Sequence, residues 1–538
     1  MFSFLHSYSP EVWGPTVRHG LFGDHDGVRF HQWLLTKEDR RFNVLAQKDS
    51  EVYNIVRDGR RPFYIDRIQG GCNISEYPYD QNLLNVYREM LGDNFMGFQM
   101  HEWFSNYGSD VYWKLGDLSP EEWTRENIDR VMREKFPGPY LFLESMTMEE
   151  MLEYGKPTTY EEYYHNITSI YKKRQKVGQL VPCDSGAIAF QFELQAGSTR
   201  LMPEVGGQIP HTRMQVCYAR GMTRKAGRSF GIYYEPWGGD PFTCCTYFGL
   251  KDEWNISTDP YFPFRPGGPN GGSSRSLQKR IMLYGYLSNA EFMSEEWGMY
   301  NTFLEGTDYE LSPYGIVKKN FLDFTRKYKD IGSKLAPIAA VIPADLYVLS
   351  DWDNPDTFSG FKHNSERMAN AKRGIKALFM DALPMLGSNH ETNRLIHSDM
   401  PDALDLLNRD DSMLGKYDYL VDLTGDGDFA DKFHNTCAIQ DVPMLLKKLL
   451  PCYVEGGLHW MVNERTGGGY YLTVFNHGGV TRSVADGERT LPEADASVTV
   501  TFKENVSPAL LEGDGSIMKD GEMYRVSVPA GGFAFIAF

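Results

Sequence analysis

Short apolar segments that end in polar residues alternate with helical patterns through the first two thirds of the chain. Eight segments have the length of buried strands: residues 63–69, 95–102, 139–145, 179–184, 199–204, 230–235, 291–296 and 337–343. Between most of them apolar residues recur at helical spacing, as Leu277, Ile281 and Tyr284 do before the seventh strand. Eight strands that alternate with helices predict a parallel (β/α)8 barrel over residues 61–343. Segment 337–343 could equally be the first strand of the next domain.

The segments on either side of the predicted barrel have other patterns. Residues 1–60 are irregular and rich in tryptophan, histidine and charge, so we expect a cap over the barrel or a contact between subunits. Residues 344–452 combine helical patterns with the apolar strand 417–423, which predicts a small open α/β domain. Residues 453–538 contain short apolar strands separated by turns, which predict a C-terminal antiparallel β-sandwich.

The composition narrows the range of functions. The formal net charge of −17 argues against a nucleic-acid partner, because no basic field offsets the repulsion from phosphates. The chain has no run of 18 apolar residues, so we expect no membrane span and no membrane partner. The first residues lack the basic and apolar regions of a signal peptide, and the seven cysteines have no framework spacing. We therefore expect a soluble cytoplasmic protein with free thiols.

Acidic residues stand at or near the ends of most predicted barrel strands. They are Asp66, Glu102, Glu144, Glu204, Glu235 and the adjacent pair Glu295 and Glu296. In a parallel barrel the carboxyl ends of all strands meet at one face, which is where enzymes of this fold carry their chemistry. Like charges in a shared cleft raise one another's pKa and can separate into an acid and a base. Two such carboxyl groups are the minimum for cleaving a glycosidic bond.

Aromatic and polar residues lie beside these acids in the sequence. Aromatic residues make up 14% of the chain, and their faces can stack on the apolar C–H faces of sugar rings. Fixed donors and acceptors next to such faces suit a ligand that is rich in hydroxyl groups. We therefore predict a carbohydrate substrate with these binding residues: Asp66, His101, Glu102, Trp103, Glu144, Asp184, Tyr234, Trp237 and Trp297. Asp184 could instead cap the helix that follows it.

The catalytic residues are expected among Glu204, Glu235, Glu295 and Glu296. In an extended strand Glu295 and Glu296 face opposite sides, so only one of them can point straight into the barrel mouth. Glu296 is favoured because it lies one step further along the strand and begins a Glu-x-Gly sequence. Glu204 begins a second Glu-x-Gly sequence, and Glu235 is either a second catalytic acid or a hydrogen-bond acceptor for the substrate.

These Glu-x-Gly sequences resemble those of the retaining glycoside hydrolases of clan A. In that clan the nucleophile often stands in such a sequence on a late barrel strand, and the acid/base residue stands on a middle strand. The order of the three predicted domains also resembles the family 42 β-galactosidases, whose α/β domain is amidotransferase-like and supports oligomers. The resemblance implies Glu296 as nucleophile, Glu204 as acid/base residue and retention of configuration. Clan A has Asn-Glu on its fourth strand, whereas Glu204 follows Pro203 and ends the fifth strand by our count.

Two other functions stay open. His101-Glu102 could bind a metal ion in a sugar isomerase or lyase, although no His-Glu-x-x-His motif is present. A non-catalytic sugar-binding protein is the third interpretation. Our expectation is a hydrolase that acts on a small intracellular oligosaccharide or glycoside, with no metal and no cofactor.

Two further features bear on the substrate and on assembly. Arg213, Arg220 and Arg224 lie on one predicted helix close to Glu204 in the sequence. An arginine of this helix that points inward would favour an anionic sugar. The aromatic residues of the first 60 positions and the extra α/β domain offer more apolar surface than a lone barrel covers, which predicts a homo-oligomer, a dimer or a trimer.

Overall fold

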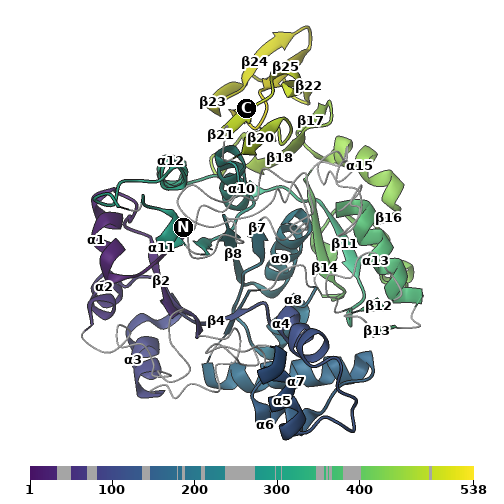
Figure 1. The fold of residues 1–538 in the computed structure, drawn as a ribbon. Helices are drawn as coiled ribbons and strands as arrows, with labels where there is room; N and C mark the ends of the chain where they lie inside the picture. The colour runs from purple at the N-terminus through teal and green to yellow at the C-terminus, as the bar shows by residue number, and fades with distance from the viewer. Residues whose placement is uncertain are drawn as a thin grey trace.

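The chain forms a barrel, a parallel α/β region beside it and a region of antiparallel sheets at one end (Figure 1). The computed structural model describes residues 1–32, 50–68, 81–135, 146–178, 180–183, 188–206, 212–236, 273–296, 298–304, 306–346, 357–358, 361–362, 366–379, 402–412, 414–483 and 487–538. None of the helices in these ranges combines the length and the apolar character that crossing a lipid bilayer requires.

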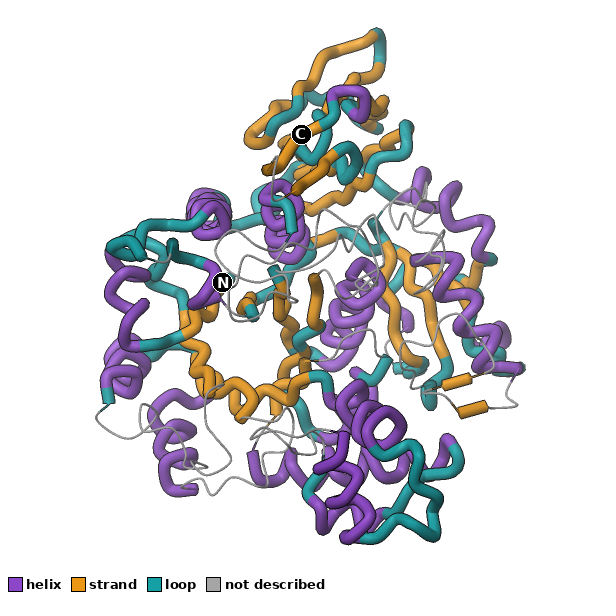
Figure 2. The backbone as a smooth tube through the Cα atoms, in the orientation of Figure 1, coloured by secondary structure: helices purple, strands orange, loops and turns teal. Residues whose placement is uncertain are grey.

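The barrel is a ring of parallel strands, drawn in orange in Figure 2. Its strands are β1 (Ser3–Ser7), β2 (Gly27–Gln32), β3 (Phe63–Ile68), β4 (Phe95–His101), β5 (Leu180–Cys183), β6 (Arg200–Leu201), β7 (Glu204–Gly206), β8 (Ser229–Glu235) and β9 (Phe292–Glu295). They pair in the order β5-β4-β3-β2-β1-β9-β8-β6, and β7 also pairs with β8. Because β6 and β7 follow each other along β8, the described strands fill eight barrel positions. The predicted (β/α)8 barrel is confirmed.

Two barrel strands lie in the segment for which we predicted a cap. β1 is the first strand of the barrel and pairs with both the second strand, β2, and the last strand, β9. Each strand is short, and each carries polar residues such as Ser7 and Arg29 that lie buried inside the protein. These polar residues interrupt the apolar pattern, which is why the sequence did not indicate a strand.

The position of each later strand changes accordingly. Segment 337–343 contributes β11 (Ile338–Ile342) to a separate sheet, which was the alternative interpretation of that segment. The predicted strand 139–145 lies outside the described residues. In chain order β4 is therefore the fourth barrel strand, β6 and β7 the sixth, β8 the seventh and β9 the eighth.

Helices cover the outside of the barrel, and some of them begin at a serine cap. They include α2 (Glu51–Gly59), α3 (Gln81–Leu91), α7 (Tyr160–Gly178), α8 (Phe190–Ala196), α9 (Thr212–Ala226), α10 (Arg275–Leu287) and α12 (Pro313–Lys327). The Ser274 hydroxyl accepts the Leu277 N–H at 3.1 Å, and the Ser312 hydroxyl accepts the Gly315 N–H at 2.9 Å. Both contacts satisfy amide groups that a helix start leaves unpaired.

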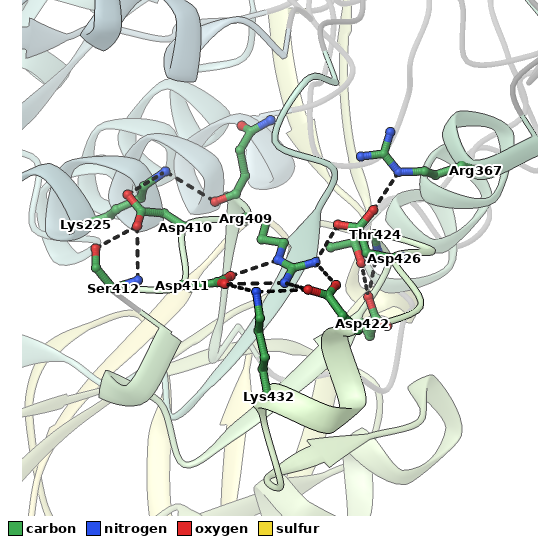
Figure 3. A network of polar contacts seen from close by, with 12 residues as sticks. Lys225, Arg367, Arg409, Asp410, Asp411, Ser412, Asp422, Thr424, Asp426 and Lys432 are labelled. Carbon is green, nitrogen blue, oxygen red and sulfur yellow. Dashed lines mark hydrogen bonds and ion pairs between the residues drawn. The ribbon is translucent and has the colours of Figure 1, made fainter.

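The parallel α/β region has the sheet order β14-β11-β15-β16. Its other strands are β14 (Leu404–Asn408), β15 (Tyr419–Asp422) and β16 (Thr436–Cys437), and its helices include α13 (Glu366–Phe379) and α15 (Val442–Leu449). At the carboxyl ends of the strands, Arg409 forms ion pairs with Asp411, Asp426 and Asp428 (Figure 3). Arg367 also pairs with Asp426, so acidic and basic side chains at this end of the sheet are bound to one another.

Two antiparallel sheets follow. The first contains β10 (Ser333–Lys334), β18 (His459–Glu464), β19 (Tyr470–Phe475), β26 (Phe533–Ala537) and β23 (Ala509–Gly513), paired in that order. The second contains β17 (Cys452–Glu455), β22 (Ala496–Phe502), β25 (Met523–Val528) and β24 (Ser516–Asp520), paired in that order. The antiparallel strands were predicted; the sandwich packing and the amidotransferase-like character of the α/β region stay predictions.

The three arginines of α9 join the barrel to the α/β region. Arg220 Nε lies 2.6 Å from Asp405 Oδ1, and Arg224 Nη1 lies 2.8 Å from Asp405 Oδ2. Arg213 Nε lies 3.9 Å from Asp402 Oδ2. These contacts neutralise two buried aspartates of the α/β region. The described contacts therefore give no support to an anionic sugar held by this helix.

Candidate active site

Alternation along the strands decides which side chains enter the barrel. Tyr64, Met202, Tyr233 and Phe292 belong to a small apolar cluster that fills the barrel interior. The Tyr64 hydroxyl also lies 2.6 Å from Ser294 Oγ. Since side chains of a strand alternate between its two faces, residues two positions further along point to the same side.

Three glutamates continue this inward-facing pattern: Glu204 begins β7, Glu235 ends β8, and Glu296 follows β9. Glu204 follows Met202, Glu235 follows Tyr233, and Glu296 follows Ser294 by two residues. One carboxyl oxygen from each of these glutamates lies within 4.8 Å of the other two. The three residues are at most 3% exposed. The sixth, seventh and eighth strands thus bring three carboxyl groups together at the barrel mouth.

Burial and mutual repulsion control the protons of this cluster. Burial raises the pKa of Glu204 well above the ordinary 4.5, and the negative charges of Glu102, Glu235 and Glu296 raise it further. Burial likewise raises the pKa of Glu235, followed by the charges of Glu296 and Glu102. Because the three carboxyl groups lie this close together, the charge of each one opposes the ionisation of the other two. Such a cluster retains protons at a pH where an exposed glutamate has lost them.

Glu102 adds a fourth carboxyl group next to the cluster. It directly follows β4, and its backbone has φ of 44°, a left-handed conformation that a non-glycine residue rarely adopts. The Glu102 N–H donates to the Cys183 carbonyl at 2.6 Å, which ties this turn to the neighbouring strand. Backbone strain of this kind is concentrated at functional sites. By the observed strand order Glu102 follows the fourth strand, and Glu204, which was predicted to end the fifth strand, lies on the sixth.

Glu295 points away from this cluster. Its carboxylate pairs with the Lys318 ammonium and accepts the Tyr314 hydroxyl, and both partners lie on α12 outside the barrel. Glu295 is fully buried and Lys318 is almost fully buried. Gly298 leaves room for this carboxylate, because a Cβ atom at that position would collide with Glu295 Oε1. The structure therefore gives Glu295 a place in the packing of α12 against the barrel.

Glu102 is the predicted substrate-binding residue that lies next to the carboxyl cluster, and the other predicted residues divide into three groups. Trp103 is fully buried, and its indole N–H donates to the Ile167 carbonyl of α7 at 3.2 Å, so it packs between helices and contacts no open site. Tyr234 belongs to the large apolar core outside the barrel. For Asp66 and His101 only the backbone is described, in β3 and β4. The remaining predicted residues, Glu144, Asp184, Trp237 and Trp297, lie outside the described part of the chain.

The sequence analysis missed Arg29 of β2. Its guanidinium lies inside the barrel, where Nη2 donates to the Tyr233 hydroxyl at 2.7 Å and Nη1 donates to Ser7 Oγ at 3.3 Å. Nη1 also donates to the backbone carbonyl of Glu295. Arg29 thus links the first, second, seventh and eighth strands beneath the acids. The alternation of Val28, Arg29 and Phe30 was the available signal.

Comparisons with known proteins give no family. No family model matches the sequence, and no curated protein matches it. Among solved structures, a β-galactosidase from Halorubrum lacusprofundi has a TM-score of 0.44 at 10% identity, covering 100% of this chain and 99% of that chain. The catalytic module of a family 98 glycoside hydrolase from Streptococcus pneumoniae has a TM-score of 0.42 at 9% identity, covering 100% and 98%.

A third similar structure is the exo-carrageenase of family 42 from Bacteroides ovatus. It has a TM-score of 0.39 at 9% identity and covers 100% of this chain and 82% of that chain. At these scores the likeness does not define an activity for this chain. The carboxyl cluster is therefore the feature from which a function can be proposed.

Proposed function

We propose that the chain is a glycoside hydrolase that cleaves a small oligosaccharide or glycoside with a carboxyl pair at the barrel mouth. The observation that carries this proposal is the convergence of Glu204, Glu235 and Glu296, with one oxygen of each within 4.8 Å of the others. Glycoside cleavage needs one protonated and one ionised carboxyl group close together. The pKa of Glu204 and of Glu235 is raised, which supports one of these two residues as the protonated group.

Glu296 is the nucleophile in this proposal. Its carboxylate attacks the anomeric carbon while Glu204 donates its proton to the leaving oxygen. Glu235 lies within 4.8 Å of both groups, and its negative charge raises the pKa of Glu204, which helps Glu204 to keep the proton that it donates. Glu204, now ionised, then takes a proton from a water molecule while the water oxygen attacks the anomeric carbon. The bond between that carbon and the Glu296 carboxylate breaks, which releases the sugar. A second displacement at the same carbon retains the configuration.

The spacing of the cluster favours retention over inversion. Retaining enzymes hold the two carboxyl groups about 5 to 5.5 Å apart, whereas inverting enzymes leave about 6.5 to 9.5 Å for a water molecule. One oxygen of Glu204 and one of Glu296 lie within 4.8 Å of each other, and this close approach supports the retaining mechanism in the proposal. The expected location in the cytoplasm stays part of this proposal.

Single substitutions test the roles. Glu296→Gln and Glu204→Gln should each lose at least about 10³-fold in turnover of an aryl glycoside with a poor leaving group. Azide should restore part of the turnover in Glu296→Ala, because a small anion can enter the space of the carboxylate. The matched control is Glu295→Gln, whose folded fraction should turn over within about tenfold of the original rate.

Two outcomes would contradict the assignment. Full activity of all three cluster variants would show that the cluster is not the catalytic centre. Loss of activity in Glu102→Gln and Glu235→Gln, with Glu296→Gln still active, would move the catalytic pair to the fourth and seventh strands. Sugar binding without turnover of any glycoside would favour the non-catalytic interpretation.

A second candidate function follows from the same cluster. Three buried carboxylates whose oxygens lie within 4.8 Å of one another also form an oxygen-rich ligand set for a divalent cation such as Mg²⁺ or Mn²⁺. A sugar isomerase or lyase would use such an ion. Elemental analysis of the purified protein separates the two functions: stoichiometric metal, with activity lost in chelator and restored by the ion, would favour this candidate.

A further inference from the structure

A groove of about 640 Å³ lies where the α/β region meets the two antiparallel sheets. One wall is formed by Pro337, Asp418 and Leu449, which belong to the α/β region or lead into it. The opposite wall is formed by aromatic residues of the antiparallel sheets. A volume of this size is typical of small-molecule sites. We call this space the junction groove.

The junction groove is remote from the carboxyl cluster. Its floor includes Lys334 of β10, whose N–H donates to Asn289 Oδ1 at 2.6 Å. Asn289 precedes β9, whereas Glu296 follows it. Asn289 and Glu296 therefore lie beyond opposite ends of the four-residue strand β9, whose length is roughly 10 to 13 Å. The groove and the barrel mouth are therefore at opposite ends of the barrel.

The aromatic wall is a continuous and fixed surface. Tyr470 and Phe538 stack with ring centroids 5.3 Å apart, and Phe538 contacts Phe502 at 4.6 Å. The Tyr470 N–H donates to the Phe538 carbonyl at 2.8 Å, and the Phe538 N–H donates to the Tyr470 carbonyl at 3.0 Å. All three rings are half-buried and line the groove. A rigid aromatic face can bind the apolar face of a sugar ring at little entropic cost.

The polar groups of the groove select the charge of the ligand. Asp418, Glu464 and Glu504 are exposed and line the groove, so they offer carboxylate oxygens to hydroxyl donors. Lys503 is the exposed lysine of the lining, and its ammonium donates to the Lys448 carbonyl. The lining thus carries more negative than positive charge at its surface. It suits an uncharged ligand with many hydroxyl groups and repels an anion.

From these observations we propose that the junction groove is a second, non-catalytic binding site for a neutral oligosaccharide. This proposal rests on the proposed function in one respect, namely that the ligand of this chain is a carbohydrate. A sugar held there would keep a longer chain attached to the protein while the barrel mouth cleaves it or another chain.

Calorimetric titration tests this site on the full chain. The Glu296→Gln variant prevents turnover, and the probes are neutral trisaccharides of glucose, galactose, xylose and mannose, each with a sulfated counterpart. We expect two sites per chain for at least one neutral trisaccharide. Tyr470→Ala in this background should weaken the second site by about tenfold or more, the effect of losing one stacking face. Glu464→Gln/Glu504→Gln, which changes only exposed groups, should weaken the same site, and Glu522→Gln is the matched exposed control.

The outcomes separate this proposal from the proposed function. No bound sugar, or sites that all keep their affinity in the Tyr470 and Glu464/Glu504 variants, would overturn the proposal of a second site in the junction groove. A sulfated trisaccharide that binds the second site as tightly would also overturn it. Turnover of aryl glycosides by the original protein is measured separately, so an inactive protein with an occupied groove would refute only the proposed function.

Discussion

Glu295 and Glu296 are adjacent in the sequence and have opposite surroundings. Alternation along β9 sends Glu296 to the carboxyl cluster and Glu295 to Lys318. Sequence reasoning could predict that only one of them enters the barrel, because alternation is a local rule. It could not predict that Glu204 and Glu235 would lie within 4.8 Å of each other, since their closeness depends on how the strands are ordered in the sheet.

The ion pair of Glu295 gives the first prediction. Lys318→Met should lower the free energy of unfolding by about 3 to 5 kcal/mol, because it leaves a fully buried carboxylate without its counter-charge. The neighbouring Lys319→Met is the control, since Lys319 pairs with Asp323 at the surface and should change stability by less than about 1 kcal/mol. Urea denaturation measures both. Equal effects of the two substitutions would contradict the structural role of Glu295.

Glu204 gives a prediction with a defined pH dependence. Its pKa is raised in the folded protein above the ordinary 4.5, so the folded state binds more protons than the unfolded state above that pH. This difference makes Glu204 lower the stability as pH rises from 4.5 through the raised value. Glu204→Gln should therefore stabilise the protein at pH 7 by about 0.5 to 2 kcal/mol while abolishing turnover.

Thermal denaturation at pH 4 and at pH 7 checks the Glu204 effect. The increase in stability from Glu204→Gln should be larger at pH 7 than at pH 4. At pH 7 a glutamate in the unfolded chain is ionised, whereas burial opposes ionisation of Glu204 in the folded protein. A variant that is less stable than the original protein at pH 7 would show that Glu204 is ionised and well paired in the fold.

At the scale of elements, the long periodic segments were predictable and the short ones were not. Helices α10 and α12 have apolar faces and serine caps, so local rules were enough to place them. β1 and β2 have only five and six residues, and their polar inward side chains break the apolar pattern. β1 pairs with β9 and with β2, and these pairings decide the place of both short strands in the barrel. The sequence of neither strand predicts them.

Helix α9 supplies a prediction about the contact between the barrel and the α/β region. Arg220 is almost fully buried and binds both the Asp405 carboxylate and the Leu404 carbonyl. Arg220→Met should lower the free energy of unfolding by about 3 kcal/mol, because Asp405 then loses a buried partner. Arg228→Met is the control, as Arg228 is exposed just after the helix. An unchanged denaturation midpoint in Arg220→Met would contradict this role.

At the scale of the whole molecule, the order of barrel, parallel α/β region and antiparallel sheets was predictable from the change in hydrophobic pattern. The contacts between these regions were not predictable, because a buried charge of the α/β region such as Asp402 acquires partners from both the barrel and an antiparallel sheet. Lys334, Arg213 and His459 all face Asp402, and His459 Nε2 lies 3.1 Å from its Oδ2. Only the assembled fold brings these residues together.

From the contacts around Asp402 we predict that the protein loses stability in mild acid. Burial lowers the pKa of His459 below 6.5 although Asp402 opposes the shift, and His477 Nε2 lies 2.9 Å from its Nδ1. Below pH 6.5 the unfolded chain binds a proton that the folded chain does not, so stability falls as pH decreases. The slope from this residue is at most about 1.4 kcal/mol per pH unit.

Urea denaturation between pH 7.5 and pH 5 measures that slope. His459→Gln should make the decrease shallower, whereas the exposed control His434→Gln should leave it unchanged. Equal slopes in the His459 variant and in the original protein would show that His459 takes up its proton without unfolding the junction.

The central claim, that Glu296 is the nucleophile of a retaining glycosidase, is tested most directly by trapping the covalent intermediate. A 2-deoxy-2-fluoro glycosyl fluoride of a sugar that the enzyme cleaves slows both steps and allows the glycosyl-enzyme to accumulate. Peptide mass spectrometry should then find one sugar on the peptide that contains Glu296, and none in Glu296→Gln. A sugar on Glu235, or full turnover of the natural glycoside with inverted product and no trapped adduct, would contradict the claim.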